Sequence, residues 1–184
     1  MKENDLRYLR TRKMIIEAMV NLLKTSNFND ISVTSICKEA QISRSGFYLH
    51  YLDKYDLVES FLKDYMVKAN QLIQTNDILN KKDFMLTMLT HLKNEGQLIA
   101  LLLSKNGSID VQTSIKEMVK ENARKNILPF LNVDISSTVE EQYILAYLSN
   151  ALFGVLQEWI NNGQKESPET IVNIINKLMT NKLN

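Results

Sequence analysis

Apolar residues along this chain recur mostly with the spacing of an α-helix. Residues 6–26 carry them near every 3.6 residues, and the same period recurs at 54–74, 83–92 and 171–178. The first helix is expected to end at Asn27, since Asn is the best residue after Gly for a left-handed helix end. Only five Gly and two Pro occur in 184 residues, which leaves few of the turn signals that separate strands. The pattern predicts an all-α protein of about nine helices.

Two short helices are predicted between the first two long ones. Ser32 is a good N-cap for a helix over residues 33–40, and Ser43 opens a second that reaches about Leu49. Asp53 then caps a longer helix. Two short helices joined by a few residues and bracketed by longer ones have the anatomy of a helix-turn-helix module.

The second short helix has two chemically different sides. Ile42, Phe47 and Tyr51 can turn inward as the small core of the module, which leaves polar side chains on its other faces. Gly46 costs about 1 kcal/mol relative to Ala inside a helix. Its bare backbone would allow this helix to lie close against another surface.

The C-terminal half of the chain reads as further helices. Residues 97–103 are apolar nearly all round and are predicted to be buried. A long helix is predicted over 138–161, and 13 of the 18 residues in 143–160 are apolar, too many for one buried stripe. Ser167 and Pro168 are strong start signals for a last helix.

A long helix that is apolar on two faces needs two partners, and the second is expected to be another copy of the chain. The last two helices of each subunit would then form a four-helix interface. Small residues such as Ala146, Ala151 and Gly154 would let the helices approach closely. The residues predicted at this homodimer interface are Leu148, Ala151, Leu152, Val155, Leu156, Ile171, Ile174, Ile175 and Leu178.

Composition and charge are those of a soluble globular chain. Hydrophobic residues make up 45% and charged residues 23%. The single Cys37 fits a reducing compartment and is expected to be a packing residue. We expect no signal peptide and no membrane span, hence a cytoplasmic protein. Residues 1–54 hold nine basic and six acidic residues, a net +3 that permits nucleic-acid binding.

Signals of catalysis are missing from the sequence. It has no Gly-rich phosphate loop and no nucleophile elbow. Two His and one Cys do not occur with the spacing of metal ligands. We therefore expect no enzyme activity, no metal and no cofactor.

Residues 28–62 resemble the DNA-binding domain of the tetracycline-repressor (TetR) family. The matching pattern is Ser43-x-x-x-Phe47-Tyr48-x-His50-Tyr51-x-Asp53-Lys54-x-Asp56-Leu57, preceded by Ile31–Ala40. The resemblance implies a DNA-binding domain over residues 1–53 and a helical regulatory and dimerisation domain over 54–184. Two departures stand out, because the family usually has Gly at Gln41 and an acidic residue at Ser35. The turn after the first short helix is therefore expected to be less relaxed, and the reciprocal half of the Ser32 cap weaker.

The same resemblance implies roles for individual residues in binding double-stranded DNA. The second short helix would lie in the major groove, where the planar fork of Arg44 can read guanine. Tyr48, His50 and Lys54 match positions that contact phosphates. The residues expected to contact DNA are Thr34, Arg44, Ser45, Gly46, Tyr48, Leu49, His50 and Lys54.

The larger domain of such proteins usually holds a pocket for a small-molecule effector. Residues that could line one, although each also fits an ordinary core, are Tyr65, Met66, Phe84, Met88, His91, Met118 and Tyr147. We expect a homodimeric, nucleoid-associated bacterial repressor that a ligand releases from a near-palindromic operator. Residues 152–163, with Ser167-Pro-Glu, are similar to a Firmicute subgroup that includes the dihydroxyacetone-kinase regulators. This favours, as the alternative, a co-regulator that acts through a partner protein and binds DNA weakly or not at all.

Overall fold

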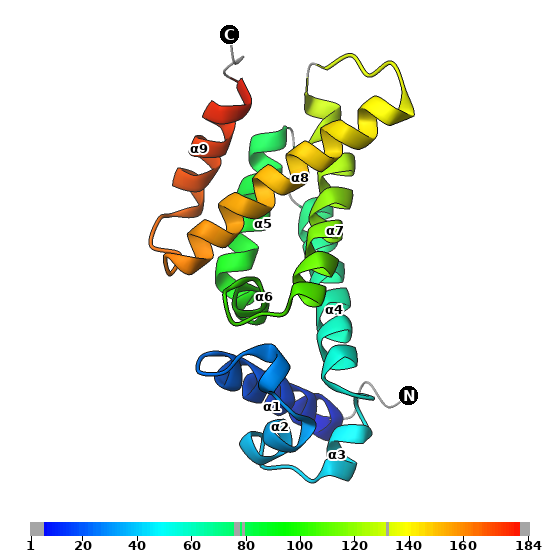
Figure 1. Cartoon of the computed structure of the whole chain (residues 1–184), viewed down its shortest axis with the longest axis vertical. Coiled ribbons are helices and arrows are strands. Elements are labelled where there is room, and N and C mark those ends of the chain that lie inside the picture. The colour runs from blue at the N-terminus through cyan, green and yellow to red at the C-terminus, as the bar shows by residue number, and fades with distance from the viewer. Residues whose placement is uncertain (1–5, 76–77, 79, 132, 181–184) are drawn as a thin grey trace. The chain divides into compact units, whose positions relative to one another are not determined.

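The computed structural model describes residues 6–75, 78, 80–131 and 133–180, and its regular structure there is entirely helical (Figure 1). The predictions of an all-α fold and of about nine helices are confirmed. In chain order the elements are α1 (Leu6–Leu23), the 3-10 turn η1 (Phe28–Asp30), α2 (Val33–Glu39), α3 (Arg44–Tyr48), α4 (Lys54–Thr75), α5 (Lys81–Glu95), α6 (Gln97–Leu103), α7 (Ile109–Asn126), the 3-10 turn η2 (Leu128–Phe130), α8 (Thr138–Asn161) and α9 (Pro168–Thr180).

The helices group into two compact units. The first unit contains the chain up to Lys68 together with Gln97–Ser108, and the second contains Ala69–Gly96 together with the residues from Ile109 on. Helix α6 therefore packs with the N-terminal helices, mainly against α1, although it lies far along the chain. The functional division at residues 53 and 54 stays a prediction.

The core of the first unit joins all of its helices. Its fully buried side chains are Ile15, Met19, Leu23, Phe28, Ile36, Phe47, Leu57, Leu98, Leu102 and Leu103. Asn106, in the turn after α6, adds two hydrogen bonds to this packing. Its side-chain amide donates to the Leu23 carbonyl at 2.8 Å, and its own carbonyl accepts from the Phe28 N–H at 2.8 Å.

Helix α1 ends at Leu23, three residues earlier than the pattern predicts. The carbonyl of Leu23 accepts a hydrogen bond from the side-chain amide of Asn106 in place of a further helical N–H. Asn27 has an extended backbone (φ −73°, ψ 147°), so the left-handed end expected there is wrong.

Side-chain caps start the short helices where the sequence places them. Ser32 Oγ accepts from the Ser35 N–H at 3.1 Å, and Ser43 Oγ accepts from the Gly46 N–H at 3.0 Å. The Ser35 hydroxyl accepts in return from the Ser32 N–H at 2.9 Å, which completes a capping box. The reciprocal bond is therefore present, with a neutral hydroxyl in place of the family's usual carboxylate, and its expected weakness stays a prediction. Asp53 caps α4 by accepting from the N–H of the second and third helical residues.

The turn between α2 and α3 is a Schellman motif with Gln41 in the left-handed region, at φ 55°. The Ile42 N–H donates to the Cys37 carbonyl at 3.0 Å, and the Gln41 N–H donates to the Lys38 carbonyl at 3.3 Å. Gln carries a Cβ atom that this conformation disfavours. The expectation of a less relaxed turn at Gln41 agrees with this backbone.

In the second unit, α7 packs along α8 and α5 packs against α9 (Figure 1). Leu145, Leu148 and Leu152 of α8 are buried within the subunit. Trp159, the only Trp of the chain, is also buried, and its indole N–H donates to the Glu166 carbonyl at 3.2 Å.

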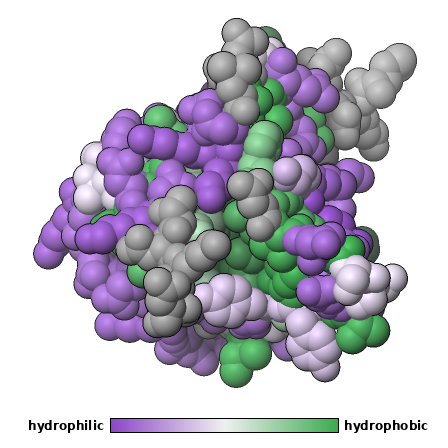
Figure 2. Space-filling view, turned by 90° about the horizontal axis from the view of Figure 1, so that it is seen from above, coloured by the Kyte–Doolittle hydropathy of each residue, from purple (hydrophilic) through white to green (hydrophobic). Residues whose placement is uncertain are grey.

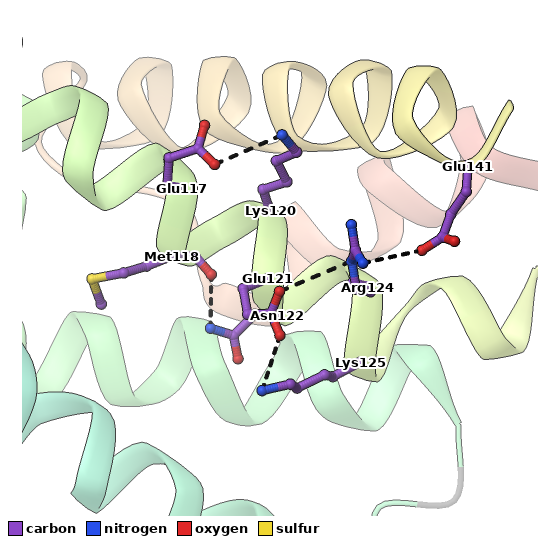
Figure 3. A network of polar contacts seen from close by, with 8 residues as sticks. All are labelled: Glu117, Met118, Lys120, Glu121, Asn122, Arg124, Lys125 and Glu141. Carbon is purple, nitrogen blue, oxygen red and sulfur yellow. Dashed lines mark hydrogen bonds and ion pairs between the residues drawn. The ribbon is translucent and has the colours of Figure 1, made fainter. Parts of the chain in front are cut away.

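A ladder of ion pairs runs along α7, and one of the pairs reaches α8 (Figure 3). Glu121 pairs with Lys125 at 3.0 Å, and Arg124 links Glu121 to Glu141 of α8, at 3.9 Å and 3.5 Å. The nearby cations lower the pKa of Glu121, Lys125 most of all. Exposed pairs of this kind contribute little to stability, so we interpret the ladder as a solvated face that helps fix the register of α7 on α8.

Replacing Gln41 with Gly should stabilise the protein by about 0.5–1 kcal/mol, because Gly adopts a positive φ without steric strain. Urea unfolding at a fixed protein concentration measures this change. Gln41→Ala is the matched control, since it keeps the Cβ atom and should bring no gain. A Gly variant no more stable than the Ala variant would show that Gln41 is not strained.

Candidate nucleic-acid interface

Helix α3 separates a buried side from an exposed one, as its sequence pattern predicts. Phe47 and Tyr51 are buried, whereas Ile42 is only half-buried. The solvent-facing side chains of the predicted DNA-contact set, all in the first unit, are Thr34, Arg44, Ser45, Tyr48 and Leu49. Leu49 is 73% exposed, so its apolar side chain is accessible to a partner surface.

Arg44 is oriented by a neighbour one helical turn away. Its Nη2 donates to the Tyr48 hydroxyl at 3.4 Å, and its guanidinium lies 6.0 Å from the centre of the Tyr48 ring. This cation–π contact holds the planar fork near the start of α3. A guanidinium that is exposed and already oriented suits recognition of a base edge.

The start of α3 offers a compact polar surface. The Ser43 and Ser45 hydroxyl groups lie 2.9 Å apart and share a hydrogen bond. A Cβ atom placed on Gly46 would lie 3.3 Å from Ser43 Oγ, so even Ala would crowd the cap there.

His50 is half-buried and stacks on Tyr8 of α1, with ring centroids 4.2 Å apart. Its Nδ1 is buried and has no hydrogen-bond partner among the described residues. Burial and the nearby positive charge of Arg12 lower the pKa of His50 below its ordinary 6.5. The neutral form of the imidazole is therefore favoured, and its predicted role as a phosphate contact stays a prediction.

Arg12 connects three elements of the first unit. Its Nε donates to the Tyr51 hydroxyl at 3.0 Å and its Nη2 to Ser60 Oγ of α4 at 3.1 Å. It also forms an ion pair with Asp64, one turn further along α4. Neither Arg12 nor Tyr8 has a role predicted from the sequence. The two residues are four positions apart and therefore lie on the same face of α1. This spacing is the sequence signal that could have indicated a shared packing face.

Lys54 is turned inward in this structure. Its ammonium group donates to the carbonyls of Phe28, Asn29 and Ile31, at 2.8, 3.0 and 2.8 Å. It also lies 4.8 Å from the centre of the Phe28 ring. The phosphate contact predicted for Lys54 therefore competes with three existing hydrogen bonds.

The residues predicted to line an effector pocket lie in different surroundings. Phe84 and His91 are buried in the second unit, where Met88 and Met118 are half-buried. Tyr65 and Met66 belong to the first unit, with Tyr65 buried and Met66 half-buried.

Tyr147 is the exception in this set, because it is 69% exposed on α8 and does not face the interior of the subunit. It is therefore a surface residue of the protomer, and we withdraw it from the pocket.

Figure 2 shows hydrophobic residues gathered in one area of the face in view, with hydrophilic residues around them. The existence of a pocket stays a prediction.

The predicted dimer residues divide between the core and the surface of the second unit. Leu148, Leu152, Ile171 and Ile175 are buried in the subunit's own core and so offer no free surface. Val155 and Leu156 are half-buried, and the exposed members of the set are Ala151, Ile174 and Leu178. The exposed stripe of α8 instead contains Tyr143 and Tyr147, which periodicity alone did not separate from the core.

Comparison with known proteins identifies the family. A TetR-family sequence profile, described as a transcriptional regulator C-terminal region, matches residues 80–181, more than half of the chain. The chain belongs to the TetR family of transcriptional regulators. Regulators of this type bind DNA, are typically dimers and bind small-molecule effectors, and the family is not generally enzymatic.

Individual relatives are distant. An uncharacterised HTH-type transcriptional regulator of Bacillus subtilis (strain 168), YxbF, is 20% identical over 173 residues, 90% of this chain and 44% of that protein. The chain thus spans less than half the length of this relative.

Solved structures show the same fold at low identity. A TetR transcriptional regulator from Streptococcus agalactiae 2603V is 19% identical, with a TM-score of 0.68, and the match covers 94% of this chain and 95% of that one. The dihydroxyacetone kinase operon activator DhaS is 22% identical, with a TM-score of 0.60, and the match covers 92% and 93%.

The described parts of the chain show neither a membrane-spanning helix nor a cluster of metal-ligating side chains. No helix there is both long and apolar enough to cross a membrane. Within the same residues, no group of three or more His, Cys, Asp or Glu side chains could hold a metal ion.

The lowered pKa of His50 predicts how stability depends on pH. Protonation is harder in the folded state, so the stabilising effect is complete above pH 6.5 and is lost as pH falls below 6.5. Between pH 7.5 and 5.5, the free energy of unfolding should fall more in the wild type than in His50→Phe. The Phe variant keeps a ring against Tyr8 but cannot titrate. Urea unfolding at both pH values measures the difference, and equal losses would contradict the assignment.

Proposed function

We propose that the chain is a homodimeric DNA-binding repressor that is released from a near-palindromic operator by a small-molecule effector. The observation that supports this most is the exposed, polar side of α3, where Arg44 is oriented by Tyr48. The helix itself is fixed by the Ser43 cap and by the buried Phe47. Such a protein would work in the bacterial cytoplasm, at the nucleoid.

The domain would contact DNA in two ways, through base edges and through the sugar-phosphate backbone. Arg44 would read guanine through O6 and N7, and Leu49 offers an apolar surface that suits a thymine methyl group. Thr34, Ser45, Tyr48 and the Gly46 backbone would contact sugars, phosphates or neighbouring base edges. Phosphate contacts of this kind fix register but carry no sequence information.

The exposed stripe of α8 supports a homodimer. Tyr143 and Tyr147 are 74% and 69% exposed and lie one turn apart, and Ala151 continues the row. Gly154 is exposed, and a Cβ atom placed on it would meet nothing within 4 Å. Apolar residues next to small ones are suited to a closely packed helix pair across a two-fold axis. Such a dimer would place two recognition helices roughly 34 Å apart, one turn of DNA.

Release by an effector would be a shift between two populations of the dimer. A ligand lowers DNA affinity when it binds more tightly to a conformation in which the recognition helices are misplaced. The loss in DNA-binding free energy cannot exceed the difference between the ligand's binding free energies for the two conformations.

In vitro selection from random double-stranded DNA at a stated, near-physiological salt concentration tests the proposal. An enriched near-palindrome would support a DNA-reading dimer and would give the operator. Binding at low salt only, with no enriched sequence, would favour the co-regulator that acts through a partner protein.

Replacing Arg44 with Ala should weaken binding to the selected operator by about 1–3 kcal/mol and relax specificity at one base position. Arg44→Lys is the matched control, because it keeps the charge but loses the bidentate fork. The Lys variant should lose discrimination at the same position while its salt dependence stays unchanged. Fluorescence anisotropy with single-base operator variants measures both, and an equal loss on every sequence would contradict base reading.

Gly154→Arg should produce a monomer that remains folded. A Cβ atom at Gly154 meets nothing within 4 Å, so a side chain can leave the helix there, and replacing Gly in a helix adds about 1 kcal/mol of helix propensity. It would, however, prevent close approach by a second helix. Light scattering coupled to gel filtration measures the mass, with Gly154→Ala as a control that should stay dimeric. A dimeric Arg variant would exclude this stripe from the interface.

A further inference from the structure

The contacts of Lys54 saturate its side chain. An ammonium group has three N–H donors and no acceptor. Each of the three is directed at a backbone carbonyl, of Phe28, Asn29 and Ile31, at 3.0 Å or less. The cation also lies over the rings of Phe28 and Tyr55, with 4.8 and 5.5 Å to their centres. A side chain bound in this way has no donor left for a phosphate.

The three carbonyls belong to one short stretch, η1 and the residue that follows it. Carbonyls at the end of a helical turn carry partial negative charge, so a cation there is favourable. The Phe28 carbonyl also accepts the Ile31 N–H that closes the turn, at 3.2 Å. The next residue is Ser32, the N-cap of α2. Lys54 is itself the first residue of α4. Its side chain therefore joins the start of α4 to the start of α2.

A second set of polar contacts holds α4 further along its length. Arg12 of α1 binds Ser60 and Asp64 of α4 and the hydroxyl of Tyr51, which follows α3. All of these residues belong to the first unit. The opening turns of α4 are thus attached to α1 and to the segments on both sides of the helix-turn-helix.

We propose that Lys54 is a positioning residue that sets α2 and α3 relative to α4, and that it is not a phosphate ligand. The proposal rests on the function proposed above, because its effect is read as operator binding. To reach a phosphate, Lys54 would have to break three hydrogen bonds and leave three backbone carbonyls without this donor. Holding these carbonyls fixes the angle at which α4 presents the recognition helix.

Two substitutions separate the two roles. Lys54→Met removes the charge and the donors but keeps most of the apolar stem. Lys54→Arg keeps the charge, but its larger planar group cannot place three donors on the same three carbonyls. A phosphate ligand would tolerate Arg and not Met, whereas a positioning residue tolerates neither.

The experiment measures affinity for the selected operator and for unrelated duplex DNA between 50 and 200 mM salt, with circular dichroism to confirm folding. Both variants should bind the operator about tenfold more weakly, a loss near 1.4 kcal/mol, and should bind unrelated DNA as the wild type does. The slope of log affinity against log salt should not change. A slope reduced by about 0.9 in Lys54→Met, with wild-type binding by Lys54→Arg, would overturn the proposal.

Hydrogen exchange on the free protein tests the same inference without DNA. Amides of residues 31–37 should exchange faster in both variants, while those of α9 keep their wild-type protection. Unchanged exchange at residues 31–37 would overturn the positioning role. If the wild type selects no operator but exchange does change, the proposed DNA-binding function fails and the attachment of α4 to α2 stands. Should Lys54→Met not fold, Lys54→Arg carries both measurements.

Discussion

The arrangement of the first unit depends on satisfying the backbone of the connection between α1 and α2. Phe28 and Ile31 of this connection are buried, at 0% and 3% exposure, so their own peptide groups are out of water. Buried N–H and C=O groups must find partners, and the connection forms too little regular structure to supply them. Asn106 and Lys54 supply them from distant parts of the chain. Helices α4 and α6 are therefore both held to the helix-turn-helix by the need of this connection for hydrogen-bond partners.

This arrangement has a consequence for regulation. Side chains from α4 and from the turn after α6 fix the same short connection, so a displacement of either element reaches α2 through hydrogen bonds and not only through apolar contacts. Apolar surfaces can slide over one another at little cost, whereas carbonyls that lose their donors are strongly penalised when buried. The recognition helix is thus expected to follow these elements closely.

Local chemistry explains which features the sequence predicts well. Ser32, Ser43 and Asp53 act as caps where the pattern places them, because an N-cap is a contact between near neighbours in the chain. The bounds of α6 and α8 also agree with prediction, and α8 begins at the side-chain cap of Ser137. The partners of Arg12, Lys54 and the amide of Asn106 were not predicted, because such contacts have no fixed sequence spacing.

The two sides of α8 show a further limit. A helix with apolar residues all round gives no local sign of which side meets its own subunit, so Leu148 and Tyr147 are equivalent in a periodicity argument. Only the packing of α7 on α8 separates them, with Leu148 buried and Tyr147 exposed. The DNA contacts, the effector pocket and the dimer involve partners outside the chain, and the sequence can only suggest them.

The burial of Trp159 gives the protein a built-in optical reporter. It is the only Trp in the chain, it lies in the second unit, and it is shielded from water. Its fluorescence emission therefore responds to the unfolding of that unit alone. Five of the seven Tyr residues belong to the first unit, so their absorbance follows mainly the other half of the fold. The two signals together can show whether the units unfold in one cooperative step or in succession.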